Sequence, residues 1–385
     1  MNHKLISNKF REIYDQEPII IRSPGRINLL GEHVDYNEGI VLPAAIDKAI
    51  WIGVAVSDNA ESAIYAIDLE ETFSFSLDKI ERSAKDWPNY VLGVIDQLIK
   101  NKYEFTNFNA VFGGDIPLGA GLSSSAAMEC GFLIALKELF NLDLDLLSIT
   151  KMGQLAEHTY VGTKCGIMDQ FANVFGKEDH IIRLDCRSLD YSYHKLALGS
   201  YSLVLLDTGV KHSLAESAYN KRREQCDEGV KILRNKFGIM ESLRDCDMDQ
   251  LKKVKHEMAE EVYKRCYYVV TEMQRVELAI RTLESDNLNE LGGLMYETHR
   301  GLSNYYDVSC EELDFLVDEA RSFGALGARM IGGGFGGCTL NLVKISETEN
   351  FVGQLTKRYK VQFNLKLQAV PVTIKDGTSV FSTAQ

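Results

Sequence analysis

The chain has 385 residues, 45% of them hydrophobic and 25% charged, which is typical of a globular protein with one large domain or two ordinary ones. Its 42 basic and 55 acidic side chains give a net charge of −13. That balance argues against binding to nucleic acid or to an anionic membrane, because both need a basic surface. An anionic ligand would need a local site of main-chain N–H groups, a metal ion or a few basic side chains.

Strand and helix patterns alternate irregularly along the chain. The predicted elements are, in order, strands over 50–57, 63–67, 72–77 and 108–115, helices over 124–140, 146–160 and 167–176, a strand over 200–209, a largely helical stretch from Ser213 to Arg300, and strands over 338–345 and 367–374. Because there is no regular βαβ rhythm, the sequence predicts an α+β fold. A boundary between two closely packed domains is expected near Arg183.

The first chemically rich segment is SPGRINLLGEHVDY, residues 23–36, which follows an apolar run. It holds Arg26, Asn28, Glu32, His33 and Asp35 within ten residues. Such a cluster suits a metal site, a catalytic centre or a ligand clamp, and an ordinary polar loop has the same composition.

A glycine–serine segment, GGDIPLGAGLSSSAAME at 113–129, gives the strongest chemical signal. Its glycines let the main chain turn tightly, and its serines lead into a long apolar helix. The N-terminus of a helix offers free N–H groups and the positive end of the helix dipole, which together favour phosphate binding. A single serine would suffice for a helix cap, so the triplet favours phosphate binding over simple capping. The segment lacks the lysine of a Walker loop.

Glu157 and Asp169 lie between this segment and a second glycine cluster. A turn at GTKCG, residues 162–166, would bring the two carboxylates near each other. Glu157 suits a magnesium ion, which prefers oxygen ligands, better than zinc, because no HExxH motif or close histidine pair accompanies it. Asp169 is either a cap at the start of a helix or a catalytic base.

The second glycine cluster, ARMIGGGFGGCTLNLV at 328–343, matches a dinucleotide-binding pattern formally. We reject that interpretation because the cluster follows a helix pattern and leads into a strand, the reverse of the required order. Two alternatives stay open: a hairpin that packs against another loop, and a main-chain wall beside a ligand.

The sequence also bears on the compartment. Residues 1–16 lack the apolar core of a signal peptide, and Asp47 and Lys48 interrupt the apolar stretch 39–56. Eight scattered cysteines include no CxxC pair and predict reduced thiols. We therefore expect a cytoplasmic protein.

Four segments together resemble the GHMP small-molecule kinases. GRINLLGEHVDY, PLGAGLSSSAA, CGIMDQF and IGGGFGGC occur in the order typical of that family, and the first closely resembles the galactokinase signature. The resemblance covers essentially the whole chain. It implies a ribosomal-protein-like βαβ domain, placed at 1–183, and a ferredoxin-like domain, placed at 184–385, with the active site in the cleft between them.

The resemblance also implies a function, which is phosphoryl transfer from ATP to the anomeric hydroxyl of galactose with Mg²⁺ as cofactor. Asp169 would be the catalytic residue, either taking the hydroxyl proton or mainly orienting the hydroxyl, with Arg26 beside it. Ser125 and Glu157 would hold Mg²⁺. The sugar would be bound by Glu32, His33, Asp35, Gly166 and Tyr219. The ATP phosphates would be bound by Gly119, Ala120, Gly121, Leu122, Ser123, Ser124 and Ser125.

Three alternatives to this assignment remain at the level of the sequence. The chain could be a related kinase that acts on N-acetylgalactosamine or arabinose. It could be a galactose- and ATP-binding regulator without catalysis, although such proteins lack part of the serine motif, which is complete here. The third is a zinc-dependent hydrolase built on His33 and His158.

Overall fold

The computed structural model describes residues 2–117, 119–211 and 215–381. Six strands, five of them from the N-terminal half of the chain, form one sheet in the order β13-β1-β3-β6-β4-β5. The strands are β1 (Ile19–Asn28), β3 (Pro43–Val56), β4 (Ser62–Ala66), β5 (Glu71–Phe75), β6 (Phe108–Gly114) and β13 (Ser379–Phe381). Only the pairing of β4 with β6 is parallel among these strands, and helix α2 (Asp86–Lys100) lies between them in the chain, which gives the expected βαβ unit.

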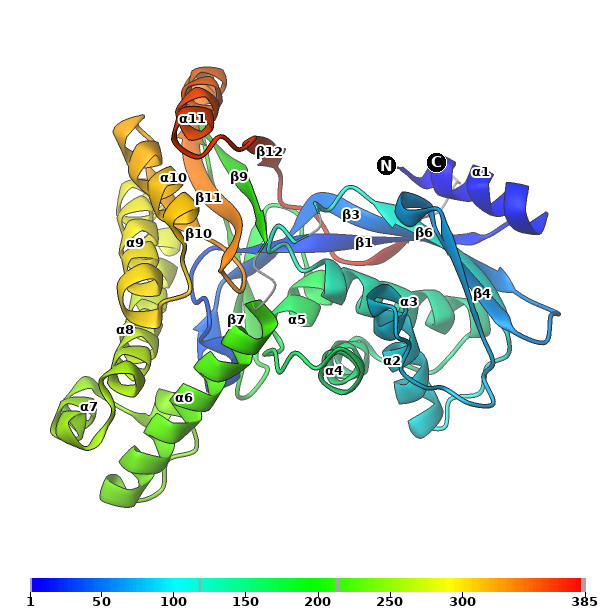
Figure 1. Cartoon of the computed structure of the whole chain (residues 1–385), viewed down its shortest axis with the longest axis horizontal. Helices are drawn as coiled ribbons and strands as arrows, with labels where there is room; N and C mark the ends of the chain where they lie inside the picture. The colour runs from blue at the N-terminus through cyan, green and yellow to red at the C-terminus, as the bar shows by residue number, and fades with distance from the viewer. Residues whose placement is uncertain (1, 118, 212–214, 382–385) are drawn as a thin grey trace.

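Helices cover both faces of this sheet (Figure 1). Helix α1 (His3–Tyr14) lies on one face, and α2, α3 (Ser124–Phe140), α4 (Leu146–Ala156) and α5 (Met168–Phe175) lie on the other. Helix α3 is buried without interruption from Ala126 to Leu136. A helix that is apolar on all sides belongs in a core, so α3 packs directly on β1 and β3 and presents its N-terminus at the edge of that core.

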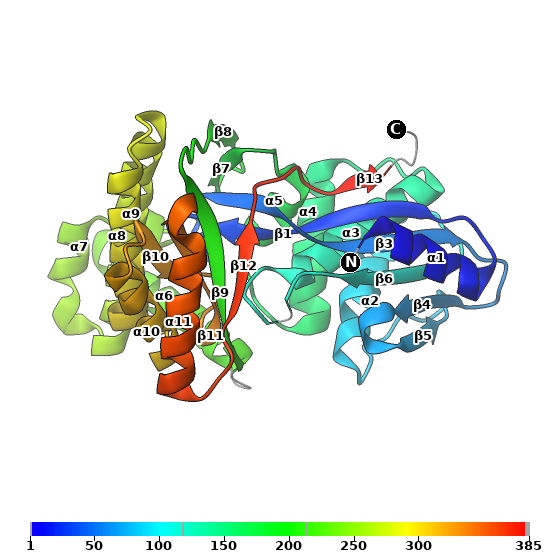
Figure 2. The ribbon, with the colours of Figure 1, turned by 90° about the horizontal axis from the view of Figure 1, so that it is seen from above.

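The C-terminal half is built on a four-stranded antiparallel sheet in the order β10-β11-β9-β12 (Figure 2). Its strands are β9 (Tyr201–Lys211), β10 (Gly327–Met330), β11 (Gly336–Lys344) and β12 (Gln368–Val372). Helices α6 (Ala215–Phe237), α7 (Met248–Lys253), α8 (Glu260–Glu284), α9 (Leu288–Gly301) and α10 (Glu311–Ser322) precede β10, and α11 (Thr348–Phe363) precedes β12. The resulting β-α-β-β-α-β order is that of a ferredoxin-like fold.

The two halves share both chain and core. A three-stranded sheet of β2 (Ile40–Val41), β7 (His180–Asp185) and β8 (Tyr191–Lys195) contains the predicted boundary, and β13 returns from the C-terminus to pair with β1. One apolar cluster includes Ile52 and Leu133 from the first half and Leu205 and Leu340 from the second. The predicted boundary near residue 183 falls within β7, and the division of the chain into two domains there stays a proposal.

Most elements agree with the sequence patterns, and the α+β class is confirmed. The helix predicted over 146–160 instead changes, at Glu157, into a π-helical turn over Glu157–Val161. Ser213, where the helical stretch was expected to begin, lies outside the described residues. The patterns missed α1, α2, α11, β1, β2, β7, β8, β10 and β13. Within the described residues, no helix is long and apolar enough to cross a membrane.

Candidate active site

Arg26 and Asp169 form the central contact of the site. Arg26 lies near the end of β1, beside an irregularity in its pairing with β3, and Asp169 is in the first turn of α5. The arginine Nε and Nη2 donate to the two carboxylate oxygens at 2.7 and 2.9 Å, and Nη1 donates to the Gly121 carbonyl at 2.6 Å. Burial lowers the pKa of Arg26, but the charges of Asp169 and Glu32 outweigh it and leave that pKa raised. The guanidinium thus joins a carboxylate to the glycine–serine segment.

The glycine–serine segment forms a tight loop before α3. Gly119 and Gly121 have φ values of 76° and 75°, which side chains rarely adopt, and Ser123 is also left-handed at 58°. Ser123 precedes the first residue of α3, yet its hydroxyl makes no capping bond and instead donates to Asp169. The first N–H groups of α3 and this hydroxyl are therefore directed to the same region.

Glu157 lies close to two other carboxylates, Glu129 and Asp169. The amide of Gln170 donates to Glu157 at 3.1 Å and to Glu129 at 3.0 Å, and the Cys165 thiol lies 3.6 Å from Glu157. Burial and the nearby Asp169 raise the pKa of Glu157 to about 7. Burial, followed by the charge of Glu157, raises the pKa of Glu129 well above its ordinary value.

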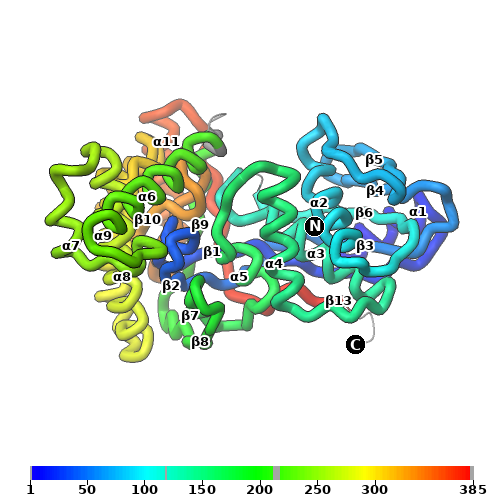
Figure 3. Tube along the Cα trace, turned by 90° about the horizontal axis from the view of Figure 1, so that it is seen from below, coloured from blue at the N-terminus to red at the C-terminus, as the bar shows by residue number. Residues whose placement is uncertain are grey.

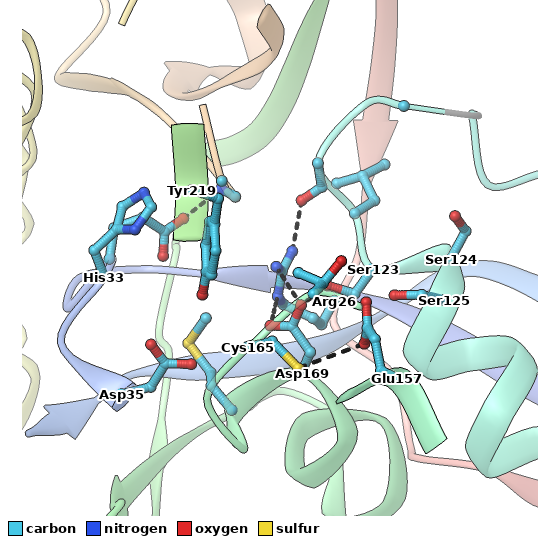
Figure 4. Close-up of a pocket in the computed structure, with 18 of the residues that line it drawn as sticks. Arg26, His33, Asp35, Ser123, Ser124, Ser125, Glu157, Cys165, Asp169 and Tyr219 are labelled. Atoms are coloured by element: carbon cyan, nitrogen blue, oxygen red, sulfur yellow. Dashed lines mark hydrogen bonds and ion pairs between the residues drawn. The ribbon is translucent and has the colours of Figure 1, made fainter. Parts of the chain in front are cut away.

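This excess of negative charge fits a divalent cation. The Ser125 hydroxyl lies near the Glu157 carboxylate, so one hydroxyl and one carboxylate face the same space (Figure 4). One oxygen of Glu129 is buried without a hydrogen bond in the described part of the chain. Mg²⁺ is usually held by one or two carboxylates together with substrate phosphates, and this donor set has that composition.

The described residues offer no site with the ligands that zinc requires. No group of three or more histidine, cysteine, aspartate or glutamate side chains among the described residues is placed to hold a metal ion. His158 Nε2 instead contacts the Cys165 carbonyl at 2.8 Å, and His33 lies among tyrosine rings. The hydrolase alternative therefore has no support in the geometry.

Glu32 lies under the second glycine cluster. Its buried carboxylate is 2.7 Å from the guanidinium of Arg329, a fully buried residue of β10, and also accepts from Asn28 and from the Gly332 N–H. Burial raises the pKa of Glu32, but Arg329 and Arg26 outweigh it and leave that pKa lowered. Glu32 is therefore held as an anion between the two halves of the chain.

His33 is buried among aromatic side chains. Its Nδ1 contacts the Tyr36 hydroxyl at 2.8 Å, and that hydroxyl contacts Tyr306 at 2.6 Å. Its Nε2 is buried without a hydrogen bond to any described residue. Burial lowers the pKa of His33 to about 4, so the ring is neutral at physiological pH and Nε2 is available to a ligand. The Tyr219 ring lies beside it at 5.3 Å between centroids.

Asp35 and Gly166 meet at close range. A Cβ added to Gly166 would lie 2.0 Å from an Asp35 carboxylate oxygen, so only glycine fits there. Burial and the charge of Asp169 raise the pKa of Asp35 to about 7. Asp35 is therefore a carboxylate that keeps a proton up to neutral pH.

These groups line one cavity of about 640 Å³ (Figure 4). Of the residues predicted from the sequence, those on the cavity wall are Arg26, Glu32, His33, Asp35, Gly119, Gly121, Leu122, Ser123, Ser124, Ser125, Glu157, Asp169 and Tyr219. Two are not on it. Ala120 is buried behind the loop, and Gly166 lines a neighbouring cavity that also contains Asp35.

The second glycine cluster agrees with both interpretations left open by the sequence, a hairpin that packs on another loop and a main-chain wall beside a ligand. It is the hairpin between β10 and β11, and it packs so tightly on the first loop that a Cβ on Gly332 would lie 2.7 Å from the Gly121 carbonyl. Gly332 and Gly333 also line the cavity. The hairpin is thus both a packing partner and a main-chain wall of the site.

A smaller, mainly apolar cavity of about 250 Å³ adjoins the start of α3. Ser124 and Ser125 line both cavities, so the two spaces meet at the glycine–serine loop. The apolar side chains on its wall are Ile50, Ala66, Leu69, Trp87, Tyr90, Phe112, Ile116 and Met128.

Sequence patterns missed several of these groups. Arg329, Gln170 and Cys165 each contact a predicted site residue, and Glu129 contacts Gln170. For Arg329 there was a signal, because a lone charge in the apolar run before a glycine cluster needs a buried partner. For Gln170 and Cys165 the only signal was their position next to Asp169 and Gly166.

The fold and the site together define a GHMP kinase. Family models match at residues 8–56 for the galactokinase galactose-binding signature, 89–177 for the GHMP kinase N-terminal domain and 279–360 for the GHMP kinase C-terminal domain. The mevalonate kinase of Methanococcus jannaschii shares the fold, with a TM-score of 0.68 at 18% identity over 94% of this chain and 99% of that one.

The nearer relatives are galactokinases. The chain is 39% identical to the galactokinase of Fusobacterium nucleatum, over 96% of this chain and 97% of that one. It is 37% identical to the galactokinase of Thermotoga maritima, over 93% of this chain and 98% of that one. A Lactococcus lactis galactokinase complexed with galactose superposes with a TM-score of 0.93 at 32% identity, over 97% and 98% of the two chains. The chain belongs to the galactokinase family.

Proposed function

We propose that this enzyme transfers the γ-phosphoryl group of ATP to the anomeric hydroxyl of galactose and releases galactose 1-phosphate and ADP. The observation that carries the proposal is the Arg26–Asp169 pair, which lies in one cavity between the phosphate loop and the cluster of Glu32, His33 and Asp35. In the reaction the hydroxyl oxygen bonds to the γ-phosphorus, the bond from that phosphorus to the β–γ bridging oxygen breaks, and the hydroxyl proton leaves.

The nucleotide is assigned to the glycine–serine loop. Gly119 and Gly121 let the main chain turn tightly without side chains in the way, and the N-terminus of α3 adds free N–H groups and its dipole, so the loop suits the ATP phosphates. The apolar cavity next to Ser124 has aromatic side chains, including Trp87, that suit a planar base. Both binding surfaces thus meet at one loop.

Ser125 and Glu157 are the proposed ligands of Mg²⁺. Bound there, Mg²⁺ would neutralise charge on the phosphate oxygens during transfer. Gln170 and Cys165 orient the Glu157 carboxylate by their contacts with it. Burial and the charge of Asp169 raise the pKa of Glu157 to about 7, and a bound cation would offset both effects.

Asp169 is the residue proposed to act on the sugar hydroxyl. Arg26 donates a hydrogen bond to each oxygen of its carboxylate, and the Ser123 hydroxyl donates a further one, so the carboxylate has little freedom to turn. It receives the hydroxyl proton or aligns the hydroxyl for attack. Arg26 also offsets negative charge near the phosphate loop, as phosphoryl transfer requires.

The sugar is assigned to Glu32, His33, Asp35, Gly166 and Tyr219. A sugar is distinguished by buried groups that each bond one hydroxyl, because an analogue that lacks this hydroxyl leaves the group unpaired. The Nε2 of His33, which has no hydrogen bond to a described residue, and the Asp35 carboxylate, whose pKa is raised by burial, have that character. We also propose that the enzyme works in the cytoplasm, which is consistent with its eight free cysteines.

A sugar panel tests the function. ADP release is measured with Mg²⁺ and ATP in the presence of galactose, glucose, N-acetylgalactosamine or arabinose, and without sugar. We expect release with galactose well above each other condition. Equal ADP release without sugar, or a higher kcat/KM on another sugar of the panel, would overturn the proposal.

A further inference from the structure

The main chain that carries Glu32 and His33 is held by the other half of the molecule. Gly31, with a φ of 96°, and Glu32 form the turn after β1, and both are buried. The Gly31 N–H donates to Glu272 at 2.9 Å, and the Tyr268 hydroxyl donates to the Glu32 carbonyl at 2.9 Å. Tyr268 and Glu272 are four residues apart on α8 and therefore lie on the same face of that helix. One helix thus bonds both the N–H of Gly31 and the carbonyl of Glu32.

Glu272 is itself fixed in place. Its carboxylate is fully buried and accepts from Arg275 Nε at 2.7 Å and from the Thr298 hydroxyl at 3.0 and 2.9 Å. With these partners the carboxylate cannot turn away from the Gly31 N–H. A buried N–H left without an acceptor is costly, so the turn stays where Glu272 holds it.

The same turn has little freedom elsewhere. Arg329 donates to the Leu29 carbonyl at 3.1 Å, and His33 is left-handed with a φ of 62°. A non-glycine residue in that conformation persists only when its surroundings enforce it. In the described structure β2 lies against α8, which brings the helix to this turn (Figure 3).

We propose that Glu272 and Tyr268 are positioning residues for sugar binding, because they set the main chain of Gly31 and Glu32 and thereby the direction of the Glu32 and His33 side chains. This inference rests on the proposed function in that the bound sugar is galactose. Neither residue lines the cavity, so each acts through the turn and not by touching a substrate.

Tyrosine-to-phenylalanine substitutions give a matched test. Tyr268→Phe removes the hydroxyl bonded to the Glu32 carbonyl, and Tyr296→Phe removes a hydroxyl bonded to the Ala325 carbonyl at 2.9 Å in the same half of the chain. We expect Tyr268→Phe to raise the KM for galactose roughly tenfold, in line with the loss of one buried hydrogen bond, and to change the KM for ATP less than twofold. Tyr296→Phe should change neither.

Substitutions of Glu272 test the second contact. Glu272→Leu removes the acceptor of the Gly31 N–H, and Glu272→Gln keeps one, so the glutamine variant should recover most of the affinity for galactose. If Glu272→Leu does not fold, the tyrosine pair decides. Equal increases in the KM for ATP and for galactose, or a Tyr268→Phe variant that matches Tyr296→Phe, would overturn the inference.

Hydrogen exchange separates this inference from the proposed function. The amides of residues 29–33 should exchange faster in Tyr268→Phe and Glu272→Leu than in the wild type and in Tyr296→Phe, whatever sugar the enzyme uses. A wild type that does not phosphorylate galactose refutes the function alone. Unchanged exchange in both variants refutes the positioning role alone.

Discussion

Arg26 and Asp169 are 143 residues apart in the chain and meet through two hydrogen bonds of 2.7 and 2.9 Å. This fork-to-carboxylate geometry fixes both side chains, and the third contact of Arg26, with the Gly121 carbonyl, ties them to the phosphate loop. The position of the proposed catalytic carboxylate is therefore coupled to that of the loop proposed to hold ATP.

Two substitutions of Asp169 separate proton transfer from orientation. Asp169→Ala removes both functions, and Asp169→Asn keeps the shape and a hydrogen-bonding oxygen but cannot take a proton. If proton transfer dominates, both variants lose about 10²–10⁴-fold in kcat, measured as galactose-dependent ADP release at saturating substrates. An asparagine variant that is far more active than the alanine variant would instead assign Asp169 to orienting the hydroxyl. Full activity in Asp169→Ala would exclude either role.

Arg26→Lys keeps the positive charge but loses the fork. Lysine cannot hold both Asp169 oxygens and the Gly121 carbonyl at once, so the carboxylate and the loop should separate. We expect kcat to fall by about 10²-fold or more, as for a displaced catalytic group, and the KM for ATP to rise as well. A kcat within twofold of the wild type would show that charge alone suffices.

How far the sequence determined the fold is clear from α3 and α4. The predicted bounds of α3, 124–140, agree with the structure, because a long apolar run after a glycine turn favours a buried helix. The helix expected over 146–160 ends at Ala156 because its last turn widens into a π-helix, which no local pattern signals. Strand β13 was missed because its pairing with β1 joins opposite ends of the chain.

In the site, too, local features could be predicted from the sequence and long-range contacts could not. Glycines, serines and carboxylates with chemical roles could be found in local segments, and most of them line one cavity. The contacts of Glu32 with Arg329 and of Gly31 with Glu272 could not, because they depend on tertiary packing over hundreds of residues. Residue types therefore indicated the chemistry, and only the fold indicated what holds each residue in place.

Asp35 should make galactose use depend on pH. Its pKa is raised to about 7 by burial and by Asp169, so the carboxylate becomes protonated as the pH falls through 7. If the sugar binds to the ionised form, kcat/KM for galactose at saturating Mg²⁺ and ATP should be about tenfold lower at pH 6 than on its plateau above about pH 8. Asp35→Asn should be weak at every pH and lack this dependence. An identical profile in the variant would assign the titration to another group.

Ser125 and Glu157 should set the requirement for Mg²⁺. Ser125→Ala removes one of two proposed protein ligands and should raise the Mg²⁺ concentration for half-maximal rate by about tenfold, because Glu157 is then the one proposed ligand that the protein still supplies. Ser124→Ala is the matched control, since the Ser124 side chain points away from Glu157 (Figure 4). It should affect the KM for ATP more than the response to Mg²⁺. If both variants respond alike to Mg²⁺, Ser125 is not a ligand.

His33 should make the folded state less stable in mild acid. Burial lowers its pKa from 6.5 to about 4, so between those values the unfolded chain binds a proton that the folded chain does not. The contribution of His33 to the free energy of unfolding should therefore decrease as the pH falls from 6.5 toward 4, by about 2 kcal/mol between pH 7 and pH 5.

Urea unfolding of the wild type and of His33→Gln at these two pH values measures this contribution, because the glutamine variant lacks the titrating group. The difference in unfolding free energy between the two proteins should shift in favour of the variant at pH 5. His256→Gln, at a side chain that is 76% exposed, controls for the loss of an imidazole. A difference that stays constant between the two pH values would mean that His33 accepts a proton in the folded protein as readily as in the unfolded chain.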